Sequence, residues 1–295
     1  MSESTFEITA IRYGHHHRNA AANFIGGDEH DGPMPLDYYV WAIKGPTKTY
    51  LLDTGFDAAM GKQRNRQLVR PIEEGLATIG LAPGDISDII ISHMHFDHAG
   101  NREMFPHATY HVQEAEMAFC TGRCMCQPFL NHSFDVKDVQ AMIGRIYDGK
   151  VCFHAGDNEI EPGLSVHLIG GHTKGLQAVR VKTQRGWVVL GSDAAHFYAN
   201  FEQYRPFPVV ESVADMMAGY DRMRQLATSI RHIVPGHDPL VTERYPKARD
   251  GVAGRRPARV GDRGEGDRHL VKGVVPRLAE PTRLAVRAYE HPREE

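Results

Sequence analysis

The sequence lacks the features that mark several classes of protein. No apolar run approaches the length of a membrane-spanning helix, about 20 residues. The first residues carry acidic Glu3 and Glu7 where a secretory signal needs basic residues, and no apolar segment follows them. Four cysteines in 295 residues do not suggest a disulfide framework. We therefore expect a cytoplasmic protein with reduced thiols and no membrane association.

The charge is also unremarkable, with a formal net value of -3. Nucleic-acid binding normally requires a basic excess, which is missing here, so no nucleic-acid partner is expected. Hydrophobic residues make up 41% and charged residues 24%, which is ordinary for a globular enzyme with a sizeable core. Histidine, with 18 residues, is the outlier, and it binds metals as neutral imidazole.

Patterns of strands and helices interleave over the first 245 residues, which predicts an α/β or α+β layered domain. The aromatic and β-branched segments predict strands, and the segments with apolar residues at helical spacing predict helices. The expected strands are 38–43, 49–52, 89–91, 108–112, 164–169, 178–182, 187–190 and 230–234. The expected helices are 64–79, 113–118, 135–146 and 211–228.

The composition changes near Lys247, after which Arg, Gly, Pro and Asp dominate. We expect a catalytic domain over residues 1–246 and a poorly ordered Arg/Gly/Pro-rich tail over residues 247–295. The alternative is a segment read out of frame with the ancestral gene, because its composition, rich in Arg, Gly, Ala, Pro and Val, is typical of GC-rich codons read in a shifted frame. In either case no function is placed in it.

The strongest motif is His93-Met94-His95-Phe96-Asp97-His98. It follows the apolar run 89–91, which has the pattern of a strand buried on both faces. A loop that leaves a strand end can turn three imidazoles and one carboxylate towards one point. Such nitrogen and oxygen donors suit zinc.

Three more potential ligands each follow a short apolar strand: His172, Asp193 and His237. Taken alone, each is more often structural than a ligand. Because the same arrangement occurs four times, we expect one shared site at an edge of a sheet.

This series resembles the metallo-β-lactamase superfamily, and the Asp53-Thr54-Gly55 turn is similar to an early motif of that superfamily. The resemblance covers roughly residues 36–245 and implies an αββα sandwich with two metals at one edge between the sheets. It also implies that one metal is held by His93, His95 and His172, and the other by Asp97, His98 and His237. Asp193 would bridge the two metals together with a hydroxide that attacks the substrate. Asp97 would carry a proton to the leaving oxygen.

Within the superfamily, Ser92 to Gly100 and Gly191-Ser192-Asp193 are most similar to the N-acyl homoserine lactonase group of quorum-quenching hydrolases. The resemblance implies two zinc ions, a small-molecule lactone or ester substrate and hydrolysis of an ester bond. That group has a substrate-contacting tyrosine three positions after the bridging aspartate, where this chain has His196, with Tyr198 two further on. Either residue is a candidate to donate a hydrogen bond to the substrate carbonyl.

Several alternatives stay open. A glyoxalase-II-like thioesterase, or another carboxylic ester hydrolase, keeps the same ligand set. Iron or manganese could replace zinc, and a non-catalytic iron protein is a third hypothesis. Homodimers are common among similar enzymes, although nothing in this sequence shows one.

Two further segments carry donors or apolar residues without a clear role. We expect residues 13–17, Tyr13 to His17, to form a loop, either at the pocket or on the surface. The C-x3-C-x-C spacing of Cys120 to Cys126 does not match a zinc knuckle, which favours buried or idle thiols. Candidate apolar contacts for a substrate are Phe24, Met34, Tyr38, Phe119, Met125 and Phe129.

Overall fold

The computed structural model describes residues 5–246 and 258–260. The chain divides into two units, Met1–Arg263 and Gly264–Glu295, and all described residues belong to the first. The predicted tail therefore lies outside the described residues, apart from β13 (Ala258–Val260), which pairs with β1 of the first sheet. The predicted domain boundary at residue 246 stays a prediction.

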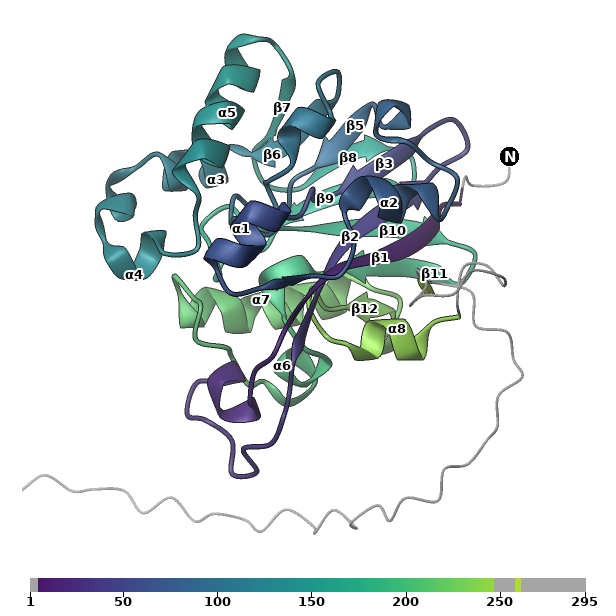
Figure 1. Cartoon of the computed structure of the whole chain (residues 1–295). Coiled ribbons are helices and arrows are strands. Elements are labelled where there is room, and N and C mark those ends of the chain that lie inside the picture. The colour runs from purple at the N-terminus through teal and green to yellow at the C-terminus, as the bar shows by residue number, and fades with distance from the viewer. Residues whose placement is uncertain (1–4, 247–257, 261–295) are drawn as a thin grey trace, which may run out of the picture. The chain divides into compact units, whose positions relative to one another are not determined.

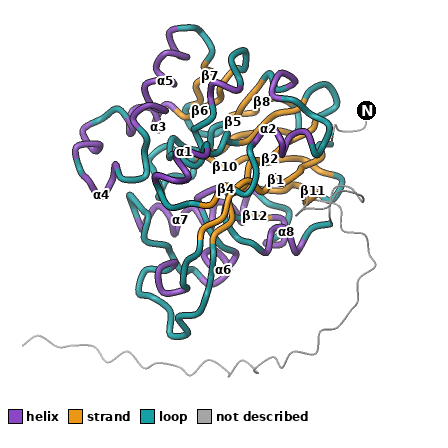
Figure 2. The backbone as a smooth tube through the Cα atoms, viewed as in Figure 1, coloured by secondary structure: helices purple, strands orange, loops and turns teal. Residues whose placement is uncertain are grey.

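Two sheets form the centre of the first unit, and helices cover them (Figures 1 and 2). Among the described residues the first sheet has eight strands, in the order β13-β1-β2-β3-β5-β6-β7, with β4 paired to β1. Its further strands are β1 (Glu7–His16), β2 (Leu36–Lys44), β3 (Thr49–Leu52), β4 (Gln67–Leu68), β5 (Asp88–Ile90), β6 (Thr109–Gln113) and β7 (Val151–His154).

The second sheet has the order β12-β11-β10-β9-β8 in the part of the chain that the structure describes. Its strands are β8 (Asn158–Glu161), β9 (Leu164–Leu168), β10 (Gln177–Thr183), β11 (Gly186–Leu190) and β12 (Ile233–Val234). The α-helices are α1 (Ala58–Gln63), α2 (Ile72–Ala77), α3 (Glu114–Cys120), α4 (Pro128–Asn131), α5 (Val136–Tyr147), α6 (Tyr198–Gln203), α7 (Val213–Leu226) and α8 (Leu240–Arg244).

Both faces of the first sheet are buried, and strand β2 shows how. Its side chains alternate between the two faces, as in any strand. Tyr39 and Trp41 join the core that fills the space between the sheets and continues to α7. Tyr38 and Val40 join a second core under α2, α3 and α5. Helix, sheet, sheet and helix thus form four layers, which confirms the predicted αββα sandwich.

Three local predictions were wrong. The helix expected over 64–79 exists only as α2, because Pro71 starts that helix and restricts the residue before it. Residues 67–68 instead pair with β1. The strand expected over 230–234 begins with a 3-10 turn, Ile230–His232, and only Ile233–Val234 is strand.

The third error concerns residues 13–17, which we expected in a loop. Residues 13–16 belong to β1, and His15 and His16 at its end pair with Asp37 and Leu36 of β2. Gly14, at a register shift in this pairing, approaches Tyr38 and Phe56 too closely to allow a larger side chain.

Among the described residues, no helix combines the length and the hydropathy that crossing a bilayer requires.

Candidate metal centre

All four predicted donor segments meet at one edge of the sandwich. Strands β9, β11 and β12 run in the same direction, because β10 is antiparallel to β9 and β11 while β12 is parallel to β11. Their carboxyl ends therefore lie together. The end of β5 is tied to this edge by two hydrogen bonds: the Ser192 hydroxyl donates to Ser92 Oγ over 2.8 Å, and the Gln177 N–H donates to the Ser92 carbonyl.

Three imidazoles form the first donor group. His93 Nε2 lies 3.0 Å from His95 Nδ1 and 3.1 Å from His172 Nε2, and the last two atoms are 2.9 Å apart. Donor atoms of a tetrahedral zinc ion are about 3.3 Å apart, because zinc–nitrogen bonds measure about 2.0–2.1 Å. The triangle therefore has the size that one such ion requires.

The second donor group consists of Asp97, His98 and His237, whose donor atoms lie within 4.8 Å of one another. Asp97 Oδ2 is 3.6 Å from His98 Nε2 and 3.8 Å from His237 Nε2. Asp193 joins the two groups. Its Oδ1 lies 2.9 Å from His237 Nε2 and 3.3 Å from His98 Nε2, whereas its Oδ2 lies 3.3 Å from His172 Nε2.

Hydrogen bonds on the far side of the rings orient these nitrogens. His172 Nδ1 donates to the Val209 carbonyl over 2.6 Å, and His237 Nδ1 donates to the Asp37 carbonyl over 3.0 Å. His98 Nδ1 donates to Asp53 Oδ2 over 2.7 Å. Each ring then turns the lone pair of its Nε2 towards the centre, an arrangement typical of metal-binding histidines.

This arrangement needs a positive charge at its centre. Lone pairs of His98 and His237 face the carboxylates of Asp97 and Asp193, and His98 Nε2 and Asp193 Oδ1 are buried without a hydrogen-bond partner. Burial alone would lower the pKa of His98 and of His237. The nearby Asp193 and Asp97 outweigh burial, so both pKa values are raised. The same carboxylates would attract a metal cation.

The first group has a different electrostatic environment. Burial, with smaller contributions from neighbouring histidines, lowers the pKa of His93 and His95 well below the usual value. Burial also lowers the pKa of His172 to about 4. All three imidazoles are therefore neutral at pH 7, which is the form that binds metals.

Asp53 supports this edge in a backbone conformation that is unusual for a residue other than glycine, with φ of 63°. The turn aims its carboxylate back at the loop after β5. Oδ1 accepts from the Ser92 N–H over 2.7 Å, and Oδ2 accepts from the Ser92 hydroxyl over 2.9 Å and from His98. One side chain thus fixes both the start of the donor loop and the orientation of a donor ring.

Glu116 and Asp37 were not singled out from the sequence. Glu116, fully buried in α3, accepts from the Met94 N–H, the Thr173 hydroxyl and the Gly175 N–H, which ties the loops carrying His93 and His172 together. Asp37 binds Arg12 and His15 through Oδ1, each over 2.6 Å. No local pattern marks either residue, because their partners are distant in sequence.

The two remaining candidates lie in different surroundings. His196 Nε2 donates to Asp193 Oδ2 over 2.9 Å, and its ring stacks on Phe207 with centroids 3.6 Å apart. Tyr198 is buried, and its ring packs against Phe201 and under the guanidinium of Arg244. The predicted contact of Tyr198 with substrate stays a prediction.

The model of the metallo-beta-lactamase superfamily matches residues 34–237, which span all seven donors. The chain belongs to this superfamily. Curated relatives include N-acyl homoserine lactonase AiiB of Agrobacterium fabrum, 33% identical over an alignment of 197 residues that covers 61% of this chain and 67% of that enzyme. The N-acyl homoserine lactonase of Bacillus cereus is 30% identical over an alignment of 171 residues that covers 55% of this chain and 60% of that enzyme. The chain thus spans about three fifths of the Bacillus relative.

Solved structures of superfamily members share the fold. One is an N-acyl homoserine lactone hydrolase with the product N-hexanoyl-L-homoserine bound at its catalytic metal centre, with a TM-score of 0.67 and 21% identity. The alignment covers 83% of this chain and 98% of that one. Another is AidC, a dizinc quorum-quenching lactonase, with a TM-score of 0.63, 16% identity and coverage of 90% and 97%. The resemblance inferred from the donor motifs is confirmed.

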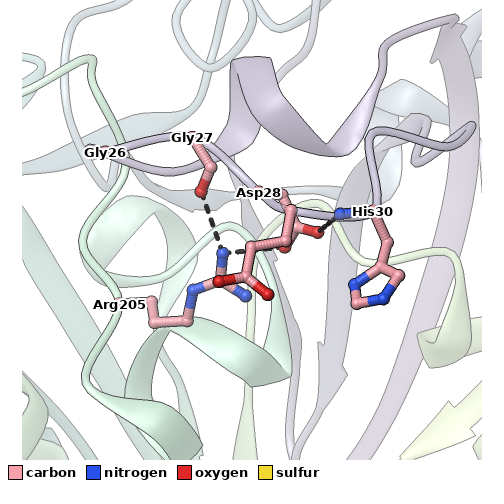
Figure 3. Close-up of a pocket in the computed structure, with 6 residues that line it drawn as sticks. Gly26, Gly27, Asp28, His30 and Arg205 are labelled. Atoms are coloured by element: carbon pink, nitrogen blue, oxygen red, sulfur yellow. Dashed lines mark hydrogen bonds and ion pairs between the residues drawn. The ribbon is translucent and has the colours of Figure 1, made fainter.

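A cavity of about 400 Å³ opens between the segment before β2 and the end of α6 (Figure 3). Arg205 crosses it and donates to the Gly27 carbonyl over 3.0 Å and to Asp28 over 2.8 Å. The guanidinium also lies 3.7 Å from the ring centroid of Phe24, which in turn contacts Phe197, the residue after His196.

The other expected apolar contacts differ in exposure. Tyr38 is buried with its ring 5.0 Å from that of His237, and Phe119 is buried, whereas Phe129 is exposed. None of the donor clusters found among the described residues includes Cys120, Cys124 or Cys126.

Proposed function

We propose that this protein is a dinuclear metal-dependent hydrolase that opens the ring of an N-acyl homoserine lactone, and that its ions are zinc. The main support is the pair of three-residue donor groups that Asp193 joins through its two oxygens. The names of the relatives give the substrate class, since the curated relatives quoted above are N-acyl homoserine lactonases. A neutral lactone also agrees with the lack of a strong charge excess.

In this proposal His93, His95 and His172 hold one ion and Asp97, His98 and His237 hold the other, with Asp193 between them. Two such ions would lower the pKa of a shared water and polarise the lactone carbonyl, so that hydrolysis proceeds at neutral pH. The donor set is nitrogen and oxygen only, and three of the nitrogens have the spacing of a tetrahedral site.

Asp97 is the residue that we propose for proton transfer. Its carboxylate is buried beside His98 and His237, and its backbone carbonyl accepts from the Tyr13 hydroxyl over 2.6 Å. This hydrogen bond holds the loop that carries the carboxylate. We propose that Asp97 takes a proton from the attacking water and passes it to the alkoxide that leaves when the ring opens.

His196 acts, in this proposal, on Asp193. The hydrogen bond from Nε2 orients the carboxylate that joins the two groups, and stacking on Phe207 holds the ring. Burial lowers the pKa of His196 to about 4, so the ring is neutral and carries its single proton on Nε2. The buried Nδ1 then carries the lone pair of the ring and has no hydrogen-bond partner among the described residues. Donation to a substrate carbonyl, as expected from the sequence, would need the other tautomer.

The test combines metal analysis with a panel of substrates. Purified protein should contain at least two zinc ions per chain, and His237→Ala should lower this number. His232→Ala, a change at a half-buried histidine in the preceding turn, serves as the matched control and should leave it unaltered. A pH-indicator assay should show turnover of acyl-homoserine lactones above that of thioesters and simple γ-lactones. Turnover of thioesters alone would replace the lactonase proposal with the thioesterase alternative.

A further inference from the structure

A second group of metal donors lies on strands β6 and β7, outside the candidate metal centre. His111 of β6 is paired in register with Cys152 of β7, and His154 follows two residues later on the same strand. One donor atom from each of the three residues lies within 4.8 Å of the others. His111 is 43 residues from His154 in sequence, and the parallel pairing of β6 with β7 brings its ring to the two residues of β7.

Strand alternation explains why the three side chains share a face. Tyr110 and Val112 of β6 point into the core under the helices, and Val151 of β7 packs against that core. Successive side chains of a strand alternate between its two faces. His111 follows Tyr110 on β6, and Cys152 and His154 lie one and three positions after Val151 on β7, so all three point to the opposite face. Figure 1 shows β5, β6 and β7 side by side, with β7 at the end of the sheet.

The two imidazoles have the spacing of metal ligands. His111 Nδ1 lies 3.1 Å from His154 Nε2, close to the separation of about 3.3 Å between two donors of a tetrahedral zinc ion. Their rings are nearly parallel, with an interplanar angle of 12°. His111 Nε2 donates to Asp88 over 3.2 Å, so Nδ1 of the same ring carries the lone pair.

Asp88 is itself held in place, as the outer partners of metal-bound histidines usually are. Its Oδ2 accepts from Lys48 Nζ over 2.7 Å and from the Ser87 hydroxyl over 2.6 Å. Lys48, Asp88 and the His111 ring thus form a chain of hydrogen bonds that fixes the orientation of the donor nitrogen, His111 Nδ1.

His154 is buried beside His111. Only 3% of its surface is exposed, yet its Nδ1 has no hydrogen-bond partner among the described residues. Burial, followed by the nearby His111, lowers its pKa to about 4, and burial also lowers the pKa of His111. Both rings are therefore neutral at pH 7 and able to bind a cation. Cys152 is exposed and gives a metal a route from solvent.

We propose that His111, Cys152 and His154 bind one thiophilic divalent metal ion of the zinc type, with the fourth position open to solvent. Two imidazoles and a thiolate are the donors that favour such an ion over magnesium or calcium. The ion would link the edge strand β7 to β6. We assign it a stabilising role, separate from hydrolysis, because none of its ligands belongs to the candidate metal centre.

Cobalt gives a test that is specific to this site. The full-length protein would be produced in cobalt-supplemented medium, so that sites fill as the chain folds. A thiolate bound to Co²⁺ absorbs strongly in the near ultraviolet, whereas the candidate metal centre has no sulfur donor. Wild-type protein should show this band. Cys152→Ser should abolish it and remove one cobalt ion per chain, while lactone hydrolysis stays at the wild-type rate.

Cys126→Ser is the matched control, because Cys126 is also an exposed free cysteine and lies in none of the donor clusters described. It should keep the band in full. His154→Gln should keep the thiol but weaken cobalt binding about tenfold or more. A wild-type spectrum without the band, or a band that survives Cys152→Ser, would overturn the proposal. These readouts do not depend on the lactonase assignment, since they report sulfur ligation rather than activity.

Discussion

Asp53→Asn tests how far the metal centre depends on residues that do not bind metal. The substitution keeps the size of the side chain and one carbonyl oxygen, which can still accept from the Ser92 N–H. The second oxygen becomes an NH₂ group. It would face His98 Nδ1 and the Ser92 hydroxyl, which both donate to it in the native structure. To avoid two donors facing each other, His98 must move its proton from Nδ1 to Nε2.

That shift places the proton on the atom that points towards Asp97 and Asp193. A protonated nitrogen cannot bind a metal. Loss of an outer partner of a metal-bound histidine typically costs 10–100-fold in metal affinity or activity, which corresponds to about 1.4–2.8 kcal/mol. We expect a loss of this size for the ion next to His98. The ion held by His93, His95 and His172 should be affected less, because none of these rings donates to Asp53 Oδ2.

Competition with a chromophoric chelator would measure the two zinc affinities, and kcat/KM would be measured at saturating zinc. Asp57→Asn is the matched control: Asp57 caps α1 by accepting from the Met60 N–H, and asparagine is an equally good cap. It should leave both affinities unchanged. If Asp53→Asn binds the zinc ion next to His98 as tightly as the wild-type protein does, the argument that Asp53 sets the His98 tautomer is wrong.

Three further perturbations test other parts of the structure. Asp97→Asn should lower kcat about 10²–10⁴-fold while part of the zinc is retained, and full activity would exclude Asp97 from proton transfer. Gly236→Ala should destabilise the protein by about 1–3 kcal/mol in urea unfolding, because the new Cβ would lie 2.8 Å from the Ser192 carbonyl; Gly84→Ala, with open space around it, should not. The pKa of His154 is lowered from 6.5 to about 4, so the unfolded chain binds more protons between these values, and stability is lost as the pH falls through them. His154→Gln should make the free energy of unfolding less dependent on pH in that range, and an unchanged slope would contradict the argument.

The sequence alone determined the donors of the candidate centre. A short apolar run predicts a buried strand, and a donor directly after such a run must lie at the sheet edge. This reasoning placed His93, His172, Asp193 and His237 at one edge without coordinates. The family fold followed from the same residues.

Long-range contacts decided the element bounds and the proton positions that the sequence pattern did not predict. Whether residues 64–70 continue a helix depended on Pro71 and on the pairing of β4 with β1, and the local periodicity alone was misleading. The proton positions on His98 and His237 depend on Asp53 and on the Asp37 carbonyl, which are 45 and 200 residues away in sequence.

The group formed by His111, Cys152 and His154 also depends on a long-range contact, the pairing of β6 with β7. Their sequence spacing matches no metal motif, and side-chain types alone do not specify which strands pair. The register of β6 against β7 is set by the packing of the whole sheet, and it is this register that places two imidazoles and a thiol within reach of one ion.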